Sequence, residues 1–454
     1  MTETKIIVLD DDPTGSQTVH SCLLLTRWDV ETLKQGLQDA APLFFVLTNT
    51  RGMSATKAAE LTRIVCRNLH LALDELAAEG TSINPLLVSR SDSTLRGHYP
   101  VETDIIAEEL GPFDAHFMVP AFFEGGRKTI NSTHYLTVDG QDIPVHETEF
   151  ANDSVFGYSH SYLPDYVEEK TAGRIKATEV ERFILDDVRG DSLSRLLALQ
   201  ENVCCVVDGE TQDDLNHFCR QLMQAAQQGK RFLFRSAASL LTALAELPPQ
   251  PVAAEAMREY VRDDMAGAVI VGSHVTKTTQ QLGQLLQLEG IKGIEIDVTR
   301  IAEHRAQLLD DIISDAEGCH AKNITPVIYT SRTELQFDDQ ASRLAFGEQV
   351  SAFLMDVVRN LPVTTGFLIS KGGITSNDVL SDGLALRTSR VAGQILAGCS
   401  VVRCPDDHPR YPGMPVVIFP GNVGDENALA TVLQRLRPDP VEIRPLNHRL
   451  NQAG

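Results

Sequence analysis

The sequence of 454 residues contains few aromatic residues, 6% of the total, and none of its apolar runs approaches the roughly 18–20 residues that a membrane-spanning helix needs. Its first twelve residues form a short apolar run that ends in three aspartates. This segment lacks the basic residues and the small-residue cleavage site of a signal peptide. We therefore expect no transmembrane helix and no membrane partner.

Basic residues are also scarce. Lysine and arginine together number 40, against 62 aspartates and glutamates, which gives a formal net charge of −22. Such a surface repels a phosphate backbone, so a general nucleic-acid-binding role is excluded. A local basic pocket for one small anion remains compatible with this charge.

The eight cysteines are scattered, without a C-x-x-C pair or a cysteine and histidine cluster at metal-ligand spacing. Cys204 and Cys205 lie in the apolar run N-V-C-C-V-V, which is typical of buried strand thiols. The histidines of residues 134–160 also lack the spacing of zinc ligands. We assign no residue to a metal site, and expect the protein in the reducing cytoplasm.

The composition, 43% apolar and 22% charged, is that of an ordinary globular protein. One pattern recurs in both halves of the chain: a short apolar run, a loop of Gly, Asp, Ser or Thr, and an amphipathic stretch. Continuous apolar runs of this kind predict parallel strands that are buried on both faces. The fold class is therefore α/β, with mostly parallel sheets flanked by helices.

The length predicts two domains, because one hydrophobic core rarely extends over so many residues. The proline-rich segment L-P-P-Q-P-V-A-A-E-A-M at 247–257 is the expected linker, and a helix should begin near Ala253. This gives a first domain at 1–246 and a second at 258–454. The less regular stretch 129–173 is expected to run over the surface of the first domain. Ligands should bind between the domains, at the carboxyl ends of the strands.

In the first half, polar residues follow the apolar runs directly. Asp11 and Asp12 follow the first run, Arg51 the next and Arg90 the third, and a later loop ends in Arg127. Arginines can hold a carboxylate through two hydrogen bonds, although each taken alone also suits a surface ion pair. The acidic residues likewise suit a helix N-terminus. Hydroxyl groups of a small acid could bind to Ser91, Asp92 and Ser93.

In the second half, three loops place small residues ahead of helical stretches, where backbone N–H groups can bind phosphate. None matches the G-x-x-x-x-G-K-[ST] or the G-x-G-x-x-G pattern. Lys371 either reaches phosphate or flanks its strand, and His274 is explained as well by its loop as by catalysis. The candidate nucleotide-binding residues are Ser273, Gly372, Gly373, Ile374, Thr375, Gly421, Asn422, Val423 and Gly424.

Six short motifs, in order along the chain, resemble those of the four-carbon acid sugar kinases. The first half carries D-D-x-T-G at 11–15, D-S-T-L-R-G at 92–97 and P-A-F-x-x-x-G-R at 120–127. The second half carries G-S at 272–273, G-G-x-T-S at 372–376 and P-G-N-x-G at 420–424. Each motif is weak alone, but the set covers nearly the whole chain.

The resemblance implies ATP-dependent phosphorylation of the terminal hydroxyl of a four-carbon sugar acid, with ATP and Mg²⁺ in the second domain and the acid in the first. Many members have lysine where this chain has Arg90. The expected reaction is D-threonate to 4-phospho-D-threonate, and the alternatives are D-erythronate and a 3-oxo-tetronate. The sequence does not fix the stereoisomer, the Mg²⁺ ligands or the oligomeric state, for which a homodimer is the working assumption.

Phosphoryl transfer depends on positioning and charge neutralisation. We expect Arg51 and Arg90 to hold the substrate carboxylate, and Asp12 or its neighbour Asp11 to accept the hydroxyl proton. Domain closure would then exclude water. Two other functions remain open: a nicotinamide-dependent sugar-acid dehydrogenase, against which the missing G-x-G-x-x-G counts, and a sensor that binds acid and nucleotide without catalysis.

Overall fold

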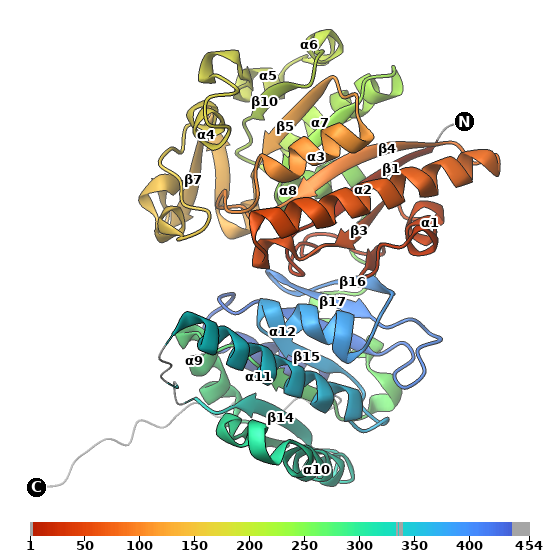
Figure 1. Ribbon diagram of the computed structural model, residues 1–454, viewed down its shortest axis with the longest axis vertical. Helices are drawn as coiled ribbons and strands as arrows, with labels where there is room; N and C mark the ends of the chain where they lie inside the picture. The colour runs from red at the N-terminus through yellow and green to blue at the C-terminus, as the bar shows by residue number, and fades with distance from the viewer. Residues whose placement is uncertain (1–2, 333–334, 336–338, 438–454) are drawn as a thin grey trace, which may run out of the picture.

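The structure is a computed structural model that describes residues 3–332, 335 and 339–437. It consists of two halves stacked along the long axis of the molecule, with strand β16 at the junction (Figure 1). Within the described residues, no helix is long and apolar enough to cross a membrane.

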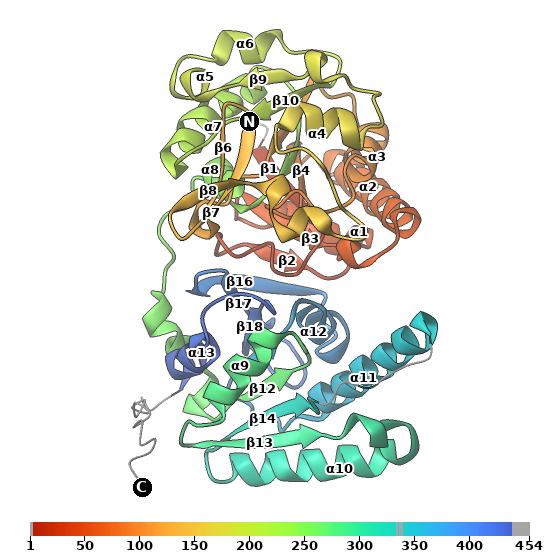
Figure 2. The same cartoon turned by 90° about the vertical axis from the view of Figure 1, so that its left-hand side faces the viewer.

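The amino-terminal half is built on parallel strands whose apolar runs are buried on both faces, as the sequence predicts. Helices cover both sides of the sheet (Figures 1 and 2). In spatial order the strands are β2 (Leu23–Leu25), β3 (Leu43–Leu47), β1 (Glu3–Asp10), β4 (Ile83–Arg90), β11 (Phe232–Ser236), β5 (Ala115–Val119), β10 (Val203–Val207) and β9 (Glu181–Phe183). The helices are α1 (Val30–Gln38), α2 (Ala55–Ala78), α3 (Val101–Leu110), α4 (Leu163–Lys170), α5 (Leu185–Arg189), α6 (Leu193–Ala198), α7 (Gln212–Gln227) and α8 (Ala238–Ala245).

The carboxyl-terminal half has five parallel strands followed by an antiparallel pair at one edge. In spatial order the strands are β13 (Ile291–Ile296), β14 (Thr325–Thr330), β12 (Ala268–Val271), β15 (Leu368–Lys371), β18 (Pro415–Phe419), β17 (Cys399–Arg403) and β16 (Thr388–Leu396). The helices are α9 (Thr276–Leu285), α10 (Ile301–His320), α11 (Gln340–Asn360), α12 (Gly373–Asp378) and α13 (Ala428–Leu436).

The two sheets join into one. Strand β16 pairs antiparallel with β2, so that fifteen strands form a continuous sheet through both halves. Ion pairs reinforce this junction, since Arg390 binds Asp39 at 2.6 Å and Arg387 binds Asp29 at 2.8 Å. The sequence predicts two separate sheets and gives no sign of this junction. Strand β2 is only three residues long, and the residues of β16 that pair with it lie over 360 positions later in the chain.

The linker segment packs against the junction instead of spanning solvent. The Pro248 carbonyl accepts a hydrogen bond from His20 at 2.6 Å, and Gln250 bonds both the N–H and the carbonyl of Gln394, at 2.8 and 3.1 Å. The helix expected near Ala253 is a 3₁₀ helix, Ala254–Tyr260. These contacts fix the segment that connects the two halves against β16 and His20.

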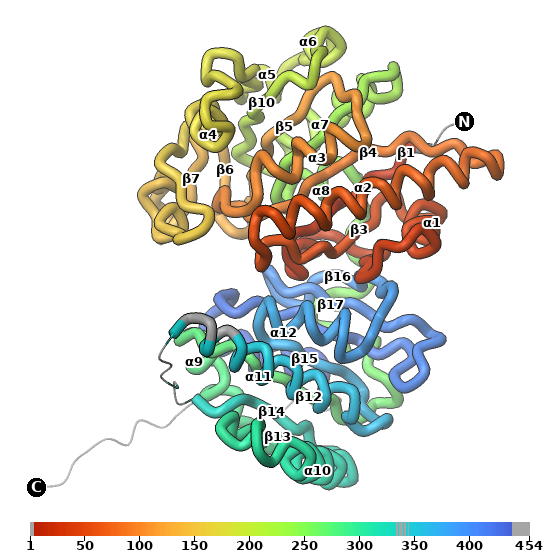
Figure 3. The backbone as a smooth tube through the Cα atoms, viewed as in Figure 1, coloured from red at the N-terminus to blue at the C-terminus, as the bar shows by residue number. Residues whose placement is uncertain are grey.

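The stretch 129–173 is more regular than its composition predicts. It contributes to a second, antiparallel sheet of β6 (Arg127–Ile130), β7 (Thr133–Val138) and β8 (Gln141–Pro144), followed by α4. This sheet lies at one side of the amino-terminal half (Figure 3). His134 connects this sheet to the loop that follows β4, because its Nε2 lies 2.8 Å from the Ser93 carbonyl, while its Nδ1 lies 2.9 Å from the Thr129 hydroxyl of β6.

Candidate active site

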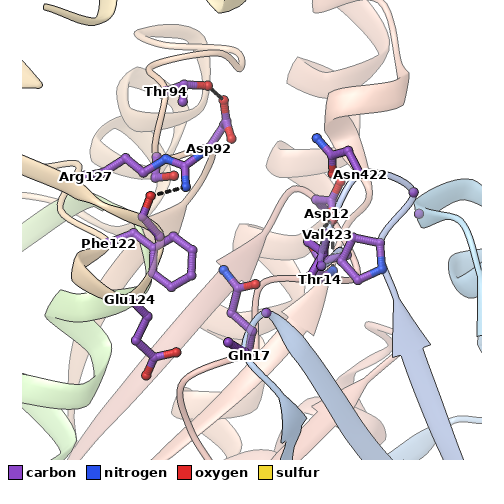
Figure 4. Close-up of a pocket in the computed structure, with 18 of the residues that line it drawn as sticks. Asp12, Thr14, Gln17, Asp92, Thr94, Phe122, Glu124, Arg127, Asn422 and Val423 are labelled. Atoms are coloured by element: carbon purple, nitrogen blue, oxygen red, sulfur yellow. Dashed lines mark hydrogen bonds between the residues drawn. The ribbon is translucent and has the colours of Figure 1, made fainter. Parts of the chain in front are cut away.

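A cavity of about 800 Å³ lies between the two halves and is lined by residues of both. Its amino-terminal wall consists of strand ends and its carboxyl-terminal wall of glycine-containing loops. In Figure 4, Asp92, Arg127 and Glu124 lie on one side of the pocket, with Asp12 and Asn422 on the other. Of the residues predicted from sequence, the lining includes Asp12, Arg51, Arg90, Asp92, Ser93, Gly373, Gly421, Asn422, Val423 and Gly424.

Asp12 faces the cavity with an ionised carboxylate. Thr14 donates to its Oδ1 through both the backbone N–H, at 2.9 Å, and the hydroxyl, at 2.5 Å. Arg51 lies 3.3 Å from its Oδ2. Although burial alone would raise the pKa of Asp12, the Arg51 guanidinium and the Thr14 hydrogen bonds hold it below its ordinary value.

The Asp12 carboxylate also lies close to the carboxyl-terminal half. A Cβ placed on Gly373, the first residue of α12, would lie 3.9 Å from Asp12 Oδ2. Because glycine has no side chain, the carboxylate and the backbone at Gly373 face the same cavity. A group bound to one is therefore within reach of a group bound to the other.

Asp11 lies behind this surface and supports it. It is 1% exposed and accepts hydrogen bonds from Arg51 Nη2 at 2.5 Å and from the Ser91 hydroxyl at 2.6 Å. Arg235 donates to the same hydroxyl at 2.7 Å and to Glu102 at 2.6 Å. Asp11 and Ser91, both predicted to bind substrate, do not line the cavity but fix the residues that do.

Asp10, at the end of β1, is fully buried, and within the described chain neither carboxylate oxygen has a hydrogen-bond partner. Burial raises the pKa of Asp10 to about 8, even though Arg90 Nη1 lies 3.9 Å from its Oδ1. A Cβ on Gly15 would lie 1.9 Å from Asp10 Oδ2. The D-D-P-T-G turn therefore requires a glycine at 15.

The segment 91–97 wraps around Ser91. Gly97 has φ +127°, and a Cβ there would lie 2.3 Å from Ser91 Oγ and 2.5 Å from Arg235 Nη2. Asp92 receives hydrogen bonds from Thr94 and, at 2.8 Å, from Arg96. Although burial opposes its ionisation, Arg51 and Arg96 hold the pKa of Asp92 well below its ordinary range. Asp92 is thus a fixed hydrogen-bond acceptor at the cavity.

The structure does not favour the carboxylate clamp predicted from sequence. Arg51 already binds the carboxylates of Asp11 and Asp12 through all three of its nitrogens. Arg90 is only 4% exposed. Strand-end position identified these arginines as cavity residues, but it could not reveal that neighbouring carboxylates already occupy Arg51.

The glycine loops of the carboxyl-terminal half offer backbone groups. Gly372 has φ +121° and Gly424 has φ +77°. Thr278 links two of the loops by donating to Ser273 Oγ at 3.2 Å and to the Gly421 carbonyl at 3.0 Å. Binding of a nucleotide phosphate at these loops stays a prediction.

Lys371 flanks its strand and does not point into the cavity. Its ammonium group is fully buried and donates to the carbonyls of Pro420, at 2.5 Å, and Gly421, at 3.2 Å. Burial lowers the pKa of Lys371 to about 7. Lys371 holds the P-G-N-x-G loop from beneath, which resolves the choice that the sequence left open.

Four predicted nucleotide-binding residues lie beside the cavity lining and not in it: Ser273, Gly372, Ile374 and Thr375. Ile374 is 75% exposed, the most exposed large apolar side chain of the described chain. His274 is also exposed and lies 3.2 Å from the Thr330 hydroxyl, outside the cavity.

Sequence reasoning missed several residues of the amino-terminal wall. Arg235, next to the last residue of β11 and beside β4, lies behind this wall and holds Ser91, and the strand-end rule that identified Arg90 applies equally to it. Arg96 and Thr94 belong to the D-S-T-L-R-G motif but received no role. Gln17 and Glu124 carried no signal, because contact across the halves brings them together: Gln394 donates to the Gln17 carbonyl at 2.8 Å and to Glu124 at 2.9 Å.

Two domain profiles match the chain. A sugar-binding N-terminal domain matches residues 6–244, and a nucleotide-binding C-terminal domain matches residues 268–429. The matches lie on either side of the segment 247–257. The region that matches the sugar-binding profile contains Asp12 and Asp92 of the cavity wall, and the region that matches the nucleotide-binding profile contains the glycine loops.

Solved structures share the fold across most of the chain. A protein from Salmonella typhimurium LT2 is 17% identical with a TM-score of 0.66, over 94% of this chain and 98% of that one. A Haemophilus influenzae protein is 16% identical with a TM-score of 0.62, over 95% of this chain and all of that one.

A curated relative is similar over a shorter region. A D-erythronate kinase from Heliobacterium modesticaldum is 30% identical over 167 residues, which cover 36% of this chain and 35% of the relative. The chain thus matches about a third of that protein's length. On the two domain profiles, which match in order on the halves that meet at the cavity, the chain belongs to the four-carbon acid sugar kinase family.

Proposed function

We propose that this protein uses ATP to phosphorylate the terminal hydroxyl of a four-carbon sugar acid. The observation that carries the proposal is the position of Asp12, an ionised carboxylate of the sugar-binding half, beside Gly373 of the nucleotide-binding half. Phosphoryl transfer needs an acceptor hydroxyl and a γ-phosphate held within reach of each other.

Asp12 is the proposed proton acceptor. Thr14 donates two hydrogen bonds to its Oδ1, whereas Oδ2 accepts one from Arg51, at 3.3 Å, and can accept a second from the substrate hydroxyl. The lowered pKa of Asp12 keeps the carboxylate ionised at neutral pH, so that it is ready to accept a proton. Arg51 then acts by fixing Asp11 and Asp12, and not by binding the substrate carboxylate.

Other hydroxyl groups of the acid would bind to the 92–93 segment. Asp92 is ionised and lines the cavity beside Ser93. The γ-phosphate would lie against the backbone of the 372–375 and 421–424 loops, where N–H groups and the start of α12 favour an anion. Domain closure around both substrates remains a prediction.

The residues fit a magnesium ion carried by the nucleotide better than one held by the protein. The described part of the chain contains no group of three or more His, Cys, Asp and Glu side chains that could hold a metal ion. Mg²⁺ usually binds through phosphate oxygens and water with one or two carboxylates. When bound, it would neutralise phosphate charge, and we assign it no protein ligand.

The proposed substrate is D-threonate, and D-erythronate and a 3-oxo-tetronate are the alternatives. The similarity to a D-erythronate kinase favours the same class of acid, but it covers about a third of that protein. We further propose domain boundaries at 246 and 258 and a cytoplasmic location, in keeping with eight free cysteines that are all buried.

A coupled assay of ADP release across all four-carbon sugar acids tests the proposal. We expect release with at least one acid, and mass spectrometry should find a monophosphate ester of that acid. Binding of acid and ATP without turnover of any acid would instead indicate a sensor. Nicotinamide oxidation or reduction by a sugar acid would indicate a dehydrogenase.

A further inference from the structure

The cavity contains four arginines, and two of them bind carboxylates. Arg51 binds Asp11 and Asp12, and Arg96 binds Asp92 at 2.8 Å. Arg90 is buried, lies 3.9 Å from Asp10, and its Nε has no hydrogen-bond partner among the described residues. The fourth, Arg127, is only half-buried at the cavity and has no acidic partner within 4 Å among the described residues.

Arg127 keeps unused donors. Its Nη1 donates to the Gly125 carbonyl, whereas Nε and Nη2 have no partner in the part of the chain that the structure describes. Nε is buried, and a buried donor without an acceptor costs free energy. Burial lowers the pKa of Arg127; the nearby Asp92 carboxylate offsets part of this effect, and Arg96 adds to it.

The loop before Arg127 is shaped to place it. The guanidinium carbon lies 5.9 Å from the centre of the Phe122 ring. A Cβ on Gly125 would lie 2.4 Å from Arg127 Nη1 and 2.5 Å from the Phe122 ring. A glycine at 125 therefore lets the guanidinium fold back to the cavity wall, beside Asp92 and across the pocket from Asp12 (Figure 4).

We infer that Arg127 binds the carboxylate of the substrate and makes the enzyme specific for acids over neutral polyols. This inference rests on the proposed sugar-acid kinase function. A carboxylate would supply the acceptor and the countercharge that Arg127 lacks. With the carboxylate at Arg127, the chain of the acid runs past Asp92 and directs its far hydroxyl toward Asp12, so that one end is recognised and the other reacts.

The test compares the acid with its uncharged amide in the full-length protein. In wild type, the Michaelis constant for the acid should be far below that for the amide. Arg127→Gln should raise the acid's constant ~10–100-fold, the scale of a charge-assisted hydrogen bond, and leave that for the amide and for ATP within about twofold. Arg174→Gln, which removes an exposed ion pair with Asp104 in the same half, should change neither.

Arg127→Lys guards against misfolding, because it keeps the charge and loses the planar fork. Its constant for the acid should lie between those of wild type and Arg127→Gln. Equal losses for acid and amide, or an unchanged constant for the acid in both variants, would overturn the inference. Calorimetric binding of the acid without ATP separates the two proposals: if wild type binds the acid more tightly than Arg127→Gln but turns nothing over, the clamp stands and the kinase function fails.

Discussion

The two walls of the cavity present different chemical groups. The amino-terminal wall and the layer behind it rely on charged and polar side chains that hold one another: Arg51 binds Asp11, Arg235 binds Ser91, and Arg96 binds Asp92. The carboxyl-terminal wall relies on backbone, with glycines at positive φ and with Lys371 beneath its loop.

This difference suits the ligands of the proposed reaction. A sugar acid differs from its neighbours in hydroxyl positions and one carboxylate, which directional side chains can distinguish. A polyphosphate needs several N–H groups at close range, which glycine backbone can supply without a side chain in the way. The difference also predicts which substitutions impair each wall. The amino-terminal wall should lose function when a side-chain functional group is removed, and the carboxyl-terminal wall when a Cβ is added to a glycine.

The largest effect is expected at Asp12, where the walls meet. Asp12→Asn keeps the volume but removes the proton acceptor, so turnover should fall about 10²-fold or more, and ATP affinity should stay close to wild type. Steady-state kinetics and calorimetry measure the two quantities. Asp406→Asn, whose side chain is 93% exposed in the other half, is the control. Near-normal turnover would move the base to another aspartate.

The next effect is structural and belongs to the amino-terminal wall. Gly97→Ala places a Cβ against Ser91 and Arg235 at φ +127°, whereas Gly80→Ala, at φ +91°, meets nothing within 4 Å. Both strain the backbone, by about 1–3 kcal/mol each. Thermal unfolding should show the larger loss for Gly97→Ala, with a raised Michaelis constant for the acid. Equal losses of stability would mean that Ser91 and Arg235 shift to accommodate the added methyl group at no cost in free energy.

The carboxyl-terminal wall offers a matched pair of glycines. Gly372 requires φ +121°, whereas a Cβ on Gly373 meets only Asp12 Oδ2, at 3.9 Å. Gly372→Ala should weaken ATP binding about tenfold, in keeping with ~1–3 kcal/mol of backbone strain. Gly373→Ala should bind ATP nearly normally but slow turnover, because its methyl group enters the space beside Asp12.

Calorimetry with ATP and steady-state kinetics test this pair. Unchanged ATP affinity in a folded Gly372→Ala variant would show that the loop is an ordinary turn. Normal turnover in Gly373→Ala would contradict the proposal that the phosphoryl group passes through the space between Gly373 and Asp12.

The last effect is a pH dependence of stability at Asp10. Its pKa is raised from 3.8 to about 8 by burial, so between those values the native state holds a proton that the unfolded chain has released. Stability conferred by this site is therefore greatest below pH 4, falls as pH rises, and levels off above pH 8. The slope approaches ~1.4 kcal/mol per pH unit.

Asp10→Asn should lack this slope. Urea unfolding at pH 6 and at pH 7.5 should show wild type losing stability relative to the variant. Parallel pH profiles would mean that Asp10 is ionised in the native state, and that Arg90 compensates its charge.

The sequence predicts the α/β class and most of the strands, because parallel strands buried on both faces read as continuous apolar runs. The strand-end rule brings Asp12, Arg51 and Asp92 to one edge, since β1 lies between β3 and β4. It does not show which arginine is free. That depends on side-chain pairing, and Arg127 follows a 3₁₀ turn and starts a strand of the second sheet.

Pairing between strands that are far apart in the chain also cannot be predicted from this sequence. The β2–β16 junction involves three residues on each strand, too few for a periodic signal. Of the two adjacent glycines at 372 and 373, the one with a positive φ is Gly372. Adjacent glycines look alike in sequence, and only the direction of the chain between β15 and α12 distinguishes them.

The central claim is that a phosphoryl group crosses from the backbone wall to an acceptor held at Asp12. A single-turnover experiment with ATP labelled in its γ-phosphate and excess enzyme, run separately with D-threonate, D-erythronate and a 3-oxo-tetronate, tests it directly. The label should appear on one of these acids in wild type, and the rate should fall about 10²-fold in Asp12→Asn. Label that appears only in inorganic phosphate, or stays on ATP with all three acids, would contradict the account.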